Sequence, residues 1–352
     1  NIEKTSNDTY LKTSKLTSPI IEDYDVLENS VALSLNSDEM SINTDFIVYE
    51  DLNKKNNSDK YEFILPRLSL TKDIKNNTSL SGNFSFISNN LIRNYQTNIF
   101  EKTNINDLVF NSNPRITNYG FYNNYDFILK NVNSDTQNSK DFKEDENFYL
   151  SGLFQYNSSL PLIKNNGNFQ NILKPKLSLK ISPNNTKDMR KKETKIDVTN
   201  IYDLQRLSRN DTVEGGISLS YGNDFTIFDK NNSRDYFGLK IANNLRLEEN
   251  DDLSQSNQLG AKTSNLFGEI TYNPNDFIKM KYNASTKNNM KDTVYENLIT
   301  ELSLNNFVTS FDYLNENNTL NKNSYLLNTT KYALDKYNNI VFSTRENKTK
   351  DY

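Results

Sequence analysis

The sequence predicts an all-β protein, most of a large antiparallel transmembrane β-barrel of the outer-membrane type that is incomplete in this chain. Apolar residues recur at every second position in segments from residue 28 to residue 346, and two residues is the period of a strand. Short turns alternate with long polar loops, as they do in outer-membrane barrels. The mean hydropathy of -0.79 is compatible with such a barrel, because its interior and loops are polar.

The alternation defines the expected strands in order along the chain. The clearest alternating segments are 42–48, 117–129, 148–156, 173–181 and 213–221. In the second of these, one parity is apolar and the other polar. We expect the apolar residues of this segment to face lipid and the polar residues to face inward. The outward residues are Tyr119, Phe121, Tyr125, Phe127 and Leu129, and the inward residues are Asn118, Asn124 and Asp126.

The connections between these segments differ in length. Residues 273–276 and 305–306 are tight turns. Long polar loops are expected at 131–145, 184–192, 229–235, 248–257, 285–292 and 315–323. One strand of about 10 residues with its share of loop takes roughly 18–20 residues, which gives roughly 18 strands. Because no composition boundary interrupts this meander, we expect residues 1–352 to be part of a single barrel domain.

A soluble β-sandwich or solenoid is the other all-β possibility. Soluble β-proteins of this length usually have more turn glycine and proline than the 10 Gly and 7 Pro found here. Disorder is disfavoured by 21 Tyr and 20 Phe, since disordered chains are poor in aromatic residues.

The composition excludes several kinds of chemistry. The chain has no His and no Cys, so Ser-His-Asp and Cys-His catalysis, thiolate sites and His-ligated metals are unavailable. We therefore expect no enzyme, no cofactor and no metal. A net charge of -4 gives no reason to expect a nucleic-acid partner. No apolar run approaches the length of a membrane-spanning helix.

Residues 184–211 form a long, polar, non-alternating stretch between two good strands. Loops of this length in compact folds are usually functional or disordered. We expect Asn200–Asp211 to fold against the barrel, with Arg206 or Arg209 pairing with an acidic neighbour, the candidates being Asp203, Asp211 and Glu214. The basic run Arg190-Lys191-Lys192 is expected to be a solvated face.

Glycine and proline mark the strands on either side of this loop. Gly215-Gly216 indicates close backbone approach or a bulge, and Pro175 removes one ladder donor from its strand and predicts weak pairing there. On the same strand, Lys174, Lys176 and Lys180 are interpreted as side chains solvated inside the barrel.

The stretch from the Pro175 strand to Gly222 carries a family resemblance. It reads Asn200-Ile201-Tyr202, then Arg206-Leu207-Ser208-Arg209-Asn210-Asp211, then Glu214-Gly215-Gly216, and ends at Tyr221-Gly222. This pattern resembles the hallmark region of the lipopolysaccharide-assembly outer-membrane proteins, the LptD (OstA/Imp) family. Arg209 stands where the family often has Gly, and Thr212 where it often has Arg. Residues 61–68 and 267–282 resemble other strands of that family.

The resemblance implies a function that composition does not show. It implies a non-enzymatic protein of the Gram-negative outer membrane that assembles lipopolysaccharide into the outer leaflet. The sugar would pass through a polar lumen, and lipid A would leave through a lateral gate between the first and last strands. Implied partners are lipopolysaccharide, outer-membrane lipid, an LptE-like plug lipoprotein and periplasmic Lpt bridge proteins. The bridge proteins would bind through an N-terminal soluble domain, and we expect that domain and the terminal barrel strands to lie outside residues 1–352.

A second function class remains open at this stage, a general porin-like passive channel. It would need a closed barrel and a constriction with opposed charges, which the 184–211 loop could supply. The 200–222 pattern favours lipopolysaccharide assembly, because a porin has no reason to carry it. A barrel enzyme is disfavoured by the absence of a His-dependent dyad.

Overall fold

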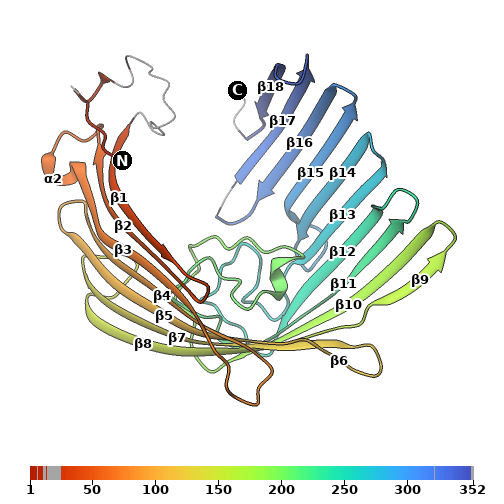
Figure 1. Ribbon diagram of the computed structural model, residues 1–352, viewed down its shortest axis with the longest axis horizontal. Helices are drawn as coiled ribbons and strands as arrows, with labels where there is room; N and C mark the ends of the chain where they lie inside the picture. The colour runs from red at the N-terminus through yellow and green to blue at the C-terminus, as the bar shows by residue number, and fades with distance from the viewer. Residues whose placement is uncertain (6, 11–12, 14–24, 321, 350–352) are drawn as a thin grey trace. The chain divides into compact units, whose positions relative to one another are not determined.

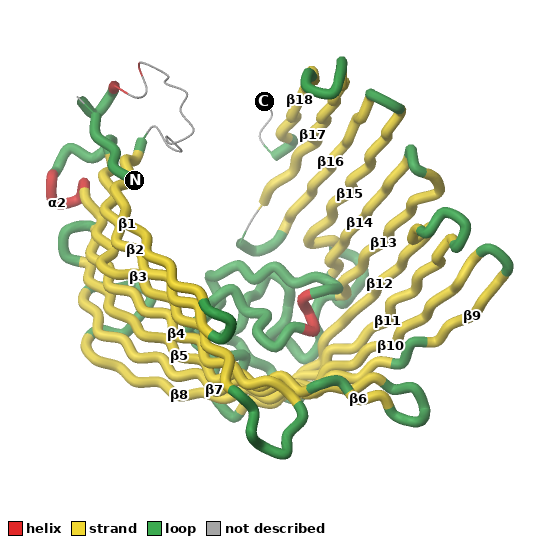
Figure 2. Tube along the Cα trace, viewed as in Figure 1, coloured by secondary structure: helices red, strands yellow, loops and turns green. Residues whose placement is uncertain are grey.

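A computed structural model describes residues 1–352 apart from 6, 11–12, 14–24, 321 and 350–352. The described residues form eighteen strands of one antiparallel sheet, so the predicted all-β class is confirmed. Among the elements that the described residues complete, the helical ones are one turn at α2 (Asn57–Lys60) and a 3-10 turn, η1 (Asn200–Tyr202) (Figure 2). No helix in the described part of the chain is long and apolar enough to cross a membrane.

The chain contains two compact units (Figure 1). The first comprises Asn1–Asn113 and Phe127–Gly152. It holds β1 (Val26–Asn36), β2 (Met40–Asp51), β3 (Tyr61–Ile74), β4 (Gly82–Tyr95) and β5 (Ile99–Ser112), with most of β7 (Tyr122–Gln137) and part of β8 (Asp145–Ser159).

The second unit comprises Pro114–Asp126 and Leu153–Tyr352. Beside the remaining parts of β7 and β8 it holds β6 (Arg115–Ile116), β9 (Leu162–Asn166), β10 (Phe169–Ser182), β11 (Gly216–Asp229), β12 (Arg234–Arg246), β13 (Leu266–Asn275), β14 (Ile278–Thr286), β15 (Thr293–Leu304), β16 (Phe307–Asn317), β17 (Lys322–Ala333) and β18 (Asn339–Asn347). From β10 onward each strand pairs antiparallel with the next.

The two faces of the sheet have inverted burial, which strand β10 shows most clearly. Its apolar residues Leu177 and Ile181 are 38% and 39% exposed, whereas Ser178 and Lys180, of the other parity, are 0% and 1% exposed. A soluble sheet buries its apolar face, so the arrangement is typical of a sheet whose apolar face meets lipid. We call the side of β10–β18 that carries Ser178 and Lys180 the polar face, and the opposite side the apolar face.

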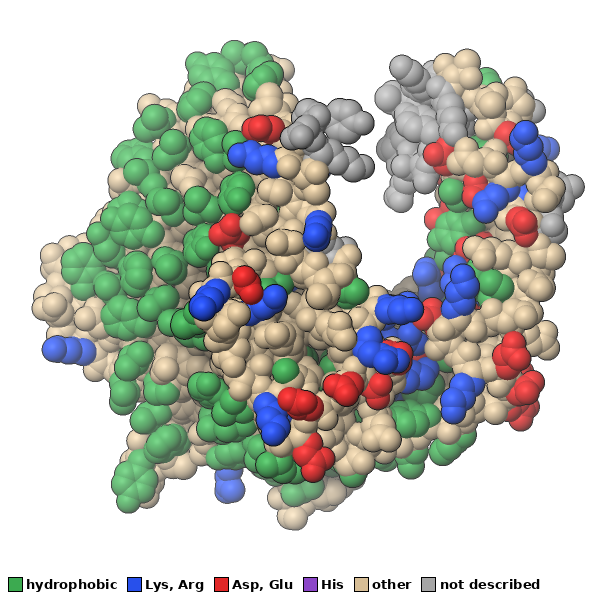
Figure 3. Space-filling model, turned by 180° about the vertical axis from the view of Figure 1, so that it is seen from behind, with side chains coloured by type: hydrophobic (Ala, Val, Ile, Leu, Met, Phe, Trp, Pro, Cys, Tyr) green, Lys and Arg blue, Asp and Glu red, His purple; other side chains and the backbone are tan. Residues whose placement is uncertain are grey.

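The apolar face continues across the second unit because residues opposite one another in a sheet share a side. Leu177 lies opposite Tyr221, and Leu219 lies opposite Leu245. Exposed apolar residues on this face include Leu173, Ile217, Ile241, Ile270, Tyr272, Met280 and Phe311. Figure 3 shows hydrophobic side chains gathered over the strands of this unit, on the left of that view.

Several predicted boundaries were wrong. Residues 117–121 form a turn, closed by Thr117 N–H donating to the Phe121 carbonyl and by Gly120 at φ +84°, so Tyr119 and Phe121 do not belong to a strand. Alternation alone could not reveal this, because a turn can also alternate. The expected 131–145 loop is strand up to Gln137, since its Asn and Ser residues continue the alternation as polar strand.

The strand after the long loop also starts later than predicted. It begins at Gly216 rather than Val213, and Val213 and Glu214 are buried within the loop. The predicted tight turn at 305–306 joins β15 to β16 as expected. The turn predicted at 273–276 lies instead at 276–277, because β13 continues to Asn275.

Candidate functional site

The candidate site is a long loop that folds onto the polar face of the second unit. We call residues 183–215, between β10 and β11, the inserted loop. It lies against three rows of side chains that register aligns across β10, β11 and β12. The rows are Lys180–Ser218–Arg246, Ser178–Ser220–Asn244 and Lys176–Gly222–Ala242.

Arg206 anchors the inserted loop to these rows. Its Nε and Nη2 donate to the two carboxylate oxygens of Glu214 at 2.6 and 2.7 Å. The remaining donors reach the carbonyl of Ile201 and the side chains of the strand rows: Ser220 at 2.8 Å, Asn244 at 2.9 Å and Ser218 at 3.2 Å. The fork shape of guanidinium permits this arrangement, which a lysine could not reproduce.

Glu214 is shared by two arginines. Arg246 Nη1 donates to its Oε1 at 2.7 Å, and Arg246 Nη2 donates to the Gly215 carbonyl. Both arginines and the carboxylate are 5% exposed or less. Burial by itself would raise the pKa of Glu214, but the positive charge and hydrogen bonds of Arg206, with Lys180 and Arg246 nearby, hold this pKa far below its usual range. Glu214 is therefore ionised at neutral pH.

A second ion pair stabilises the outer part of the inserted loop. Arg209 donates to both oxygens of Asp211 at 2.6 and 2.7 Å, and Lys187 Nζ donates to Asp211 at 2.6 Å. Asp211 is buried; burial acts to raise its pKa, and the hydrogen bonds from Arg209 and Lys187 outweigh it and lower the pKa. Both Arg206 and Arg209 thus pair with acidic neighbours, as the sequence predicted, whereas Asp203 offers its backbone carbonyl to Lys180.

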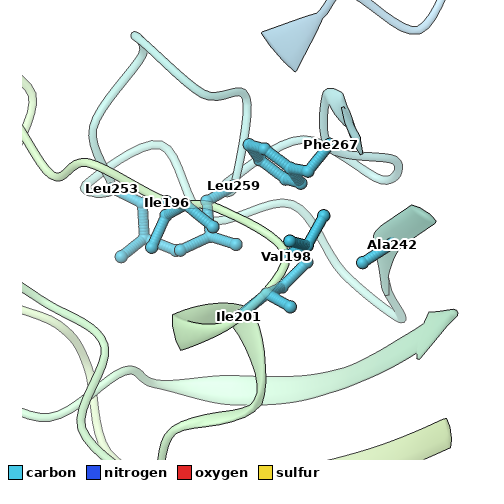
Figure 4. Packing of buried hydrophobic residues seen from close by; sticks show 7 residues of the cluster. All are labelled: Ile196, Val198, Ile201, Ala242, Leu253, Leu259 and Phe267. Carbon is cyan, nitrogen blue, oxygen red and sulfur yellow. The ribbon is translucent and has the colours of Figure 1, made fainter. Parts of the chain in front are cut away.

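Apolar packing also fixes the inserted loop against the polar face. Ile196, Val198 and Ile201 pack with Ala242 and Phe267 from β12 and β13 (Figure 4). The cluster also includes Leu253 and Leu259. Both belong to the connection between β12 and β13, residues 247–265, which we call the second loop.

Hydrogen bonds join the two loops directly. Asn257 Nδ2 donates to the Thr194 carbonyl at 2.7 Å, and Asn250 Nδ2 donates to Thr186 Oγ1 at 2.9 Å. Asn200 orders the inserted loop from within, accepting from Asp197 N–H and donating to the Lys195 carbonyl. The inserted loop therefore has buried contacts along most of its length.

The motif glycines allow close packing. A Cβ on Gly215 would overlap the Asn184 carbonyl, and one on Gly222 would overlap the Ile241 carbonyl and the Tyr202 hydroxyl. Gly216 has φ +86°, in the left-handed region that favours glycine. The close approach of neighbouring backbone explains why glycine stands at positions 215 and 222. Tyr221 points to the apolar face, where it is 41% exposed.

Pro175 lies where β10 changes partners. Residues 169–173 pair with β9, and residues 176–181 pair with β8. The Leu160 N–H donates to the Pro175 carbonyl at 3.1 Å between the two ladders. Proline has no N–H to donate to a neighbouring strand, and this loss weakens the sheet least where the pairing on that side is already interrupted.

The sequence did not identify every residue of the site. Arg246 and Asn244 lie on β12, where a lone Arg and two consecutive Asn residues do not indicate a functional site. The sequence interpretation of Lys180 was a solvated lysine. That interpretation was wrong, because Lys180 is 1% exposed under the loop and donates to Asp203. Lys176, in contrast, pairs with Asp224. The basic run 190–192 is exposed as predicted, and Arg190 pairs with Asp188.

Comparison with protein families decides the identity of the chain. The model of the family described as LptD, LPS transport system D, matches residues 1–347. The chain belongs to the LptD family. Proteins of this family are outer-membrane β-barrels that transport lipopolysaccharide to the outer membrane. No characterised protein is similar enough in sequence to be matched to the chain. The family assignment favours lipopolysaccharide transport over a passive porin.

Proposed function

We propose that residues 1–352 form part of a single barrel domain that inserts lipopolysaccharide into the outer leaflet without enzymatic chemistry. Its sugar would pass along the polar face, and lipid A would leave sideways between the first and last strands of the full-length barrel. The observation that carries the proposal is the LptD family match over residues 1–347. The inverted burial of β10, with leucines outward and serines covered, supports a barrel with a polar interior.

A groove beside the inserted loop has the chemistry that a sugar needs. It has a volume of about 580 Å³ and lies between residues 193–208 of the loop and the polar face of β15–β17. Tyr295 and Tyr325 supply flat rings, and Asn297, Asp312 and Glu316 supply hydrogen-bonding groups. Hydroxyl-rich ligands are held by such amides and carboxylates, while the rings pack against the apolar faces of sugars.

The proposed partners follow from the family. They are lipopolysaccharide, an LptE-like plug lipoprotein within the barrel, periplasmic Lpt bridge proteins and outer-membrane lipid. The proposed location is the outer membrane of a Gram-negative bacterium. In this scheme the inserted loop narrows the path that the sugar takes, and its two ion-pair networks keep it in place.

An export assay tests the role of the inserted loop. Cells that depend on the full-length protein would carry Arg209→Ala or Asp211→Ala, and surface lipopolysaccharide and outer-membrane permeability would be measured. Asp211→Ala removes the carboxylate that Arg209 and Lys187 share, and Arg209→Ala leaves buried Asp211 with Lys187 alone. Removing one partner of a buried ion pair costs more than the pair contributes in net terms. We expect reduced surface lipopolysaccharide and raised permeability.

The exposed Lys191→Ala and Lys192→Ala variants are the matched controls and should behave like wild type. If all four variants behave like wild type, the loop is a passive linker and its proposed role is wrong. If surface lipopolysaccharide is normal when the whole protein is depleted, the proposed transport function itself is wrong.

A further inference from the structure

Three cavities follow one another in the second unit. The groove of about 580 Å³ beside the inserted loop adjoins a narrow space of about 40 Å³, and that space adjoins a pocket of about 630 Å³. We call the narrow space the neck and the large one the loop pocket. The residues that line both the groove and the neck are Glu193, Lys195, Tyr295 and Glu316. Those that line both the neck and the loop pocket are Ser256, Val294 and Asn318.

The register of β15 and β16 orders the cavities along the strands. Asn297, in the groove, lies toward the short turn at 305–306, and Tyr295 and Glu316, at the neck, lie opposite one another nearer the other end of the strands. Asn318 follows the end of β16 and reaches the loop pocket. The inserted loop and the second loop leave the sheet at this same end. Because long loops lie on the outer side of such barrels, the groove leads through the neck toward the outer side.

The loop pocket repeats the chemistry of the groove. The second loop contributes the amides of Asn250 and Gln255 and the carboxylate of Glu249. Lys287 and Lys322, next to the ends of β14 and β17, add positive charge. Amides and charged groups of both signs can bond the hydroxyl groups of a sugar. A sugar therefore finds suitable hydrogen-bonding partners on both sides of the neck.

Long side chains close the neck. Lys195 Nζ donates to the Tyr295 hydroxyl at 3.1 Å and lies 4.5 Å from the centroid of the Tyr295 ring. The carboxyl groups of Glu193 and Glu316 hydrogen-bond one another, and Asn318 Nδ2 donates to Glu316 at 3.0 Å. A space of about 40 Å³ holds about one water molecule, so a sugar ring cannot pass while these contacts are made.

The backbone behind these side chains is held independently of them. Thr194, Ile196 and Val198 are buried, whereas Glu193 and Lys195 are exposed. The two buried apolar residues belong to the cluster on β12 and β13, and the Thr194 carbonyl is bonded to the second loop. Rotation of the Glu193 and Lys195 side chains can therefore open the neck while the inserted loop stays in place.

The contacts that close the neck are of a kind that breaks easily. Two carboxyl groups bond only while a proton lies between them, and they repel one another when both are ionised. The other titratable side chains among the described residues of the neck are Lys195, Asp197 and Tyr295. Sugar hydroxyls donate to carboxylates and accept from an ammonium group. An arriving sugar can therefore replace each contact and favour the open arrangement.

We propose that Glu193 and Lys195 are a side-chain gate in the route that the sugar of lipopolysaccharide takes from the groove to the loop pocket. Tyr295 and Glu316 are the fixed side of this gate. Withdrawal of the two side chains from the wall joins the groove and the loop pocket into one passage. This inference rests on the proposed function, because it concerns how the exported sugar passes the inserted loop.

Tethering the gate tests the inference in cells that depend on the full-length protein. Glu193→Cys and Glu316→Cys are introduced together, and a short bismaleimide links the two thiols across the neck. Arrival of newly made lipopolysaccharide at the cell surface is then measured by pulse labelling. We expect arrival to fall in proportion to the fraction of protein that is tethered, because a tethered neck cannot open.

A tether within the wall is the matched control. Asn323 lies opposite Glu316 on β17 and outside the set of described residues that line the neck. In Glu316→Cys with Asn323→Cys the same reagent joins two neighbouring strands without spanning the neck. Arrival should match that of the treated Glu316→Cys single variant. The treated protein without introduced thiols gives the baseline, and heat-modified gel mobility shows that each variant is folded.

Removing the gate is the complementary test. Glu193→Ala with Lys195→Ala deletes the two movable side chains and leaves the buried residues of the segment in place. Arrival of lipopolysaccharide should stay normal, because passage needs an open neck and not the gate itself. Arrival as low as in the tethered protein would mean that the two side chains position the sugar, and the gate would be wrong.

An unchanged arrival in the tethered protein would also overturn the gate. Depletion of the whole protein in the same assay separates this failure from failure of the transport function. If depletion stops arrival and the tether does not, the gate alone is wrong. If arrival stays normal after depletion, the proposed transport function is wrong as well.

Discussion

Replacing Glu214 with glutamine tests how the inserted loop is held in place. Glu214 accepts three hydrogen bonds at 2.6–2.7 Å from Arg206 and Arg246, and a fourth from Ser218 at 3.1 Å. Glutamine keeps the shape but removes the charge and turns one acceptor into a donor that faces guanidinium donors. Two buried arginines then lack their anion, which should cost about 3–5 kcal/mol.

Hydrogen–deuterium exchange of the purified barrel measures this cost locally. Because the penalty falls on the loop, amides of residues 200–215 should exchange about 10²- to 4 × 10³-fold faster, as 1.4 kcal/mol corresponds to tenfold. Amides in the middle of β15 and β16 should be unchanged.

Two matched variants sharpen the test. Arg246→Met leaves Glu214 paired with Arg206 and should have a smaller effect than Glu214→Gln. Glu249→Gln, at an exposed position in the second loop, should have none. If Glu214→Gln exchanges like wild type, the ion-pair network does not hold the loop and the reasoning is refuted.

Three further predictions use the same region. The pKa values of Glu214 and Asp211 in the folded protein lie below their usual values of 4.5 and 3.8. The two carboxylates therefore contribute stability that is fully present above the usual pKa values and is lost as the pH falls through the lowered folded-state pKa values. Protection of the loop amides should decline at acidic pH, and Glu214→Gln should show a weaker decline. Gly215→Ala and Gly222→Ala place a methyl group onto backbone atoms and should reduce folded barrel on heat-modified gels, whereas Gly268→Ala, whose Cβ would lie 3.9 Å from its nearest neighbour, should fold normally. Loop amides of Arg206→Lys should exchange faster than those of the wild type, because an ammonium cannot bond Glu214 bidentately. Exchange at the wild-type rate would mean that the positive charge alone holds the loop.

Local sequence determined the strands. Side-chain period is a property of neighbouring residues, so alternation at positions such as 173–181 predicted β10, and the contrast of Leu177 with Lys180 predicted two unlike faces. The same period misled at 117–121, where a turn preserves the alternation, and at 213–215, where Val213 and Glu214 alternate but turn into the loop.

The candidate site was predictable only in part. Arg209 and Asp211 are two residues apart, and Arg206 and Glu214 are eight apart, so composition of one short segment indicated both pairs. Arg246 and Asn244 reach the same network from β12, more than thirty residues later in the chain. Nothing in their local sequence distinguishes them from ordinary strand residues.

The sequence by itself thus determined the strand period, the absence of His and Cys chemistry, and the family pattern at 200–222. The tertiary structure alone decided that Lys180 is covered and that Glu214 pairs with two arginines. The physical reason is that period and composition act between neighbours along the chain. Burial and hydrogen bonding are instead set by register, which brings distant residues onto one face of the sheet.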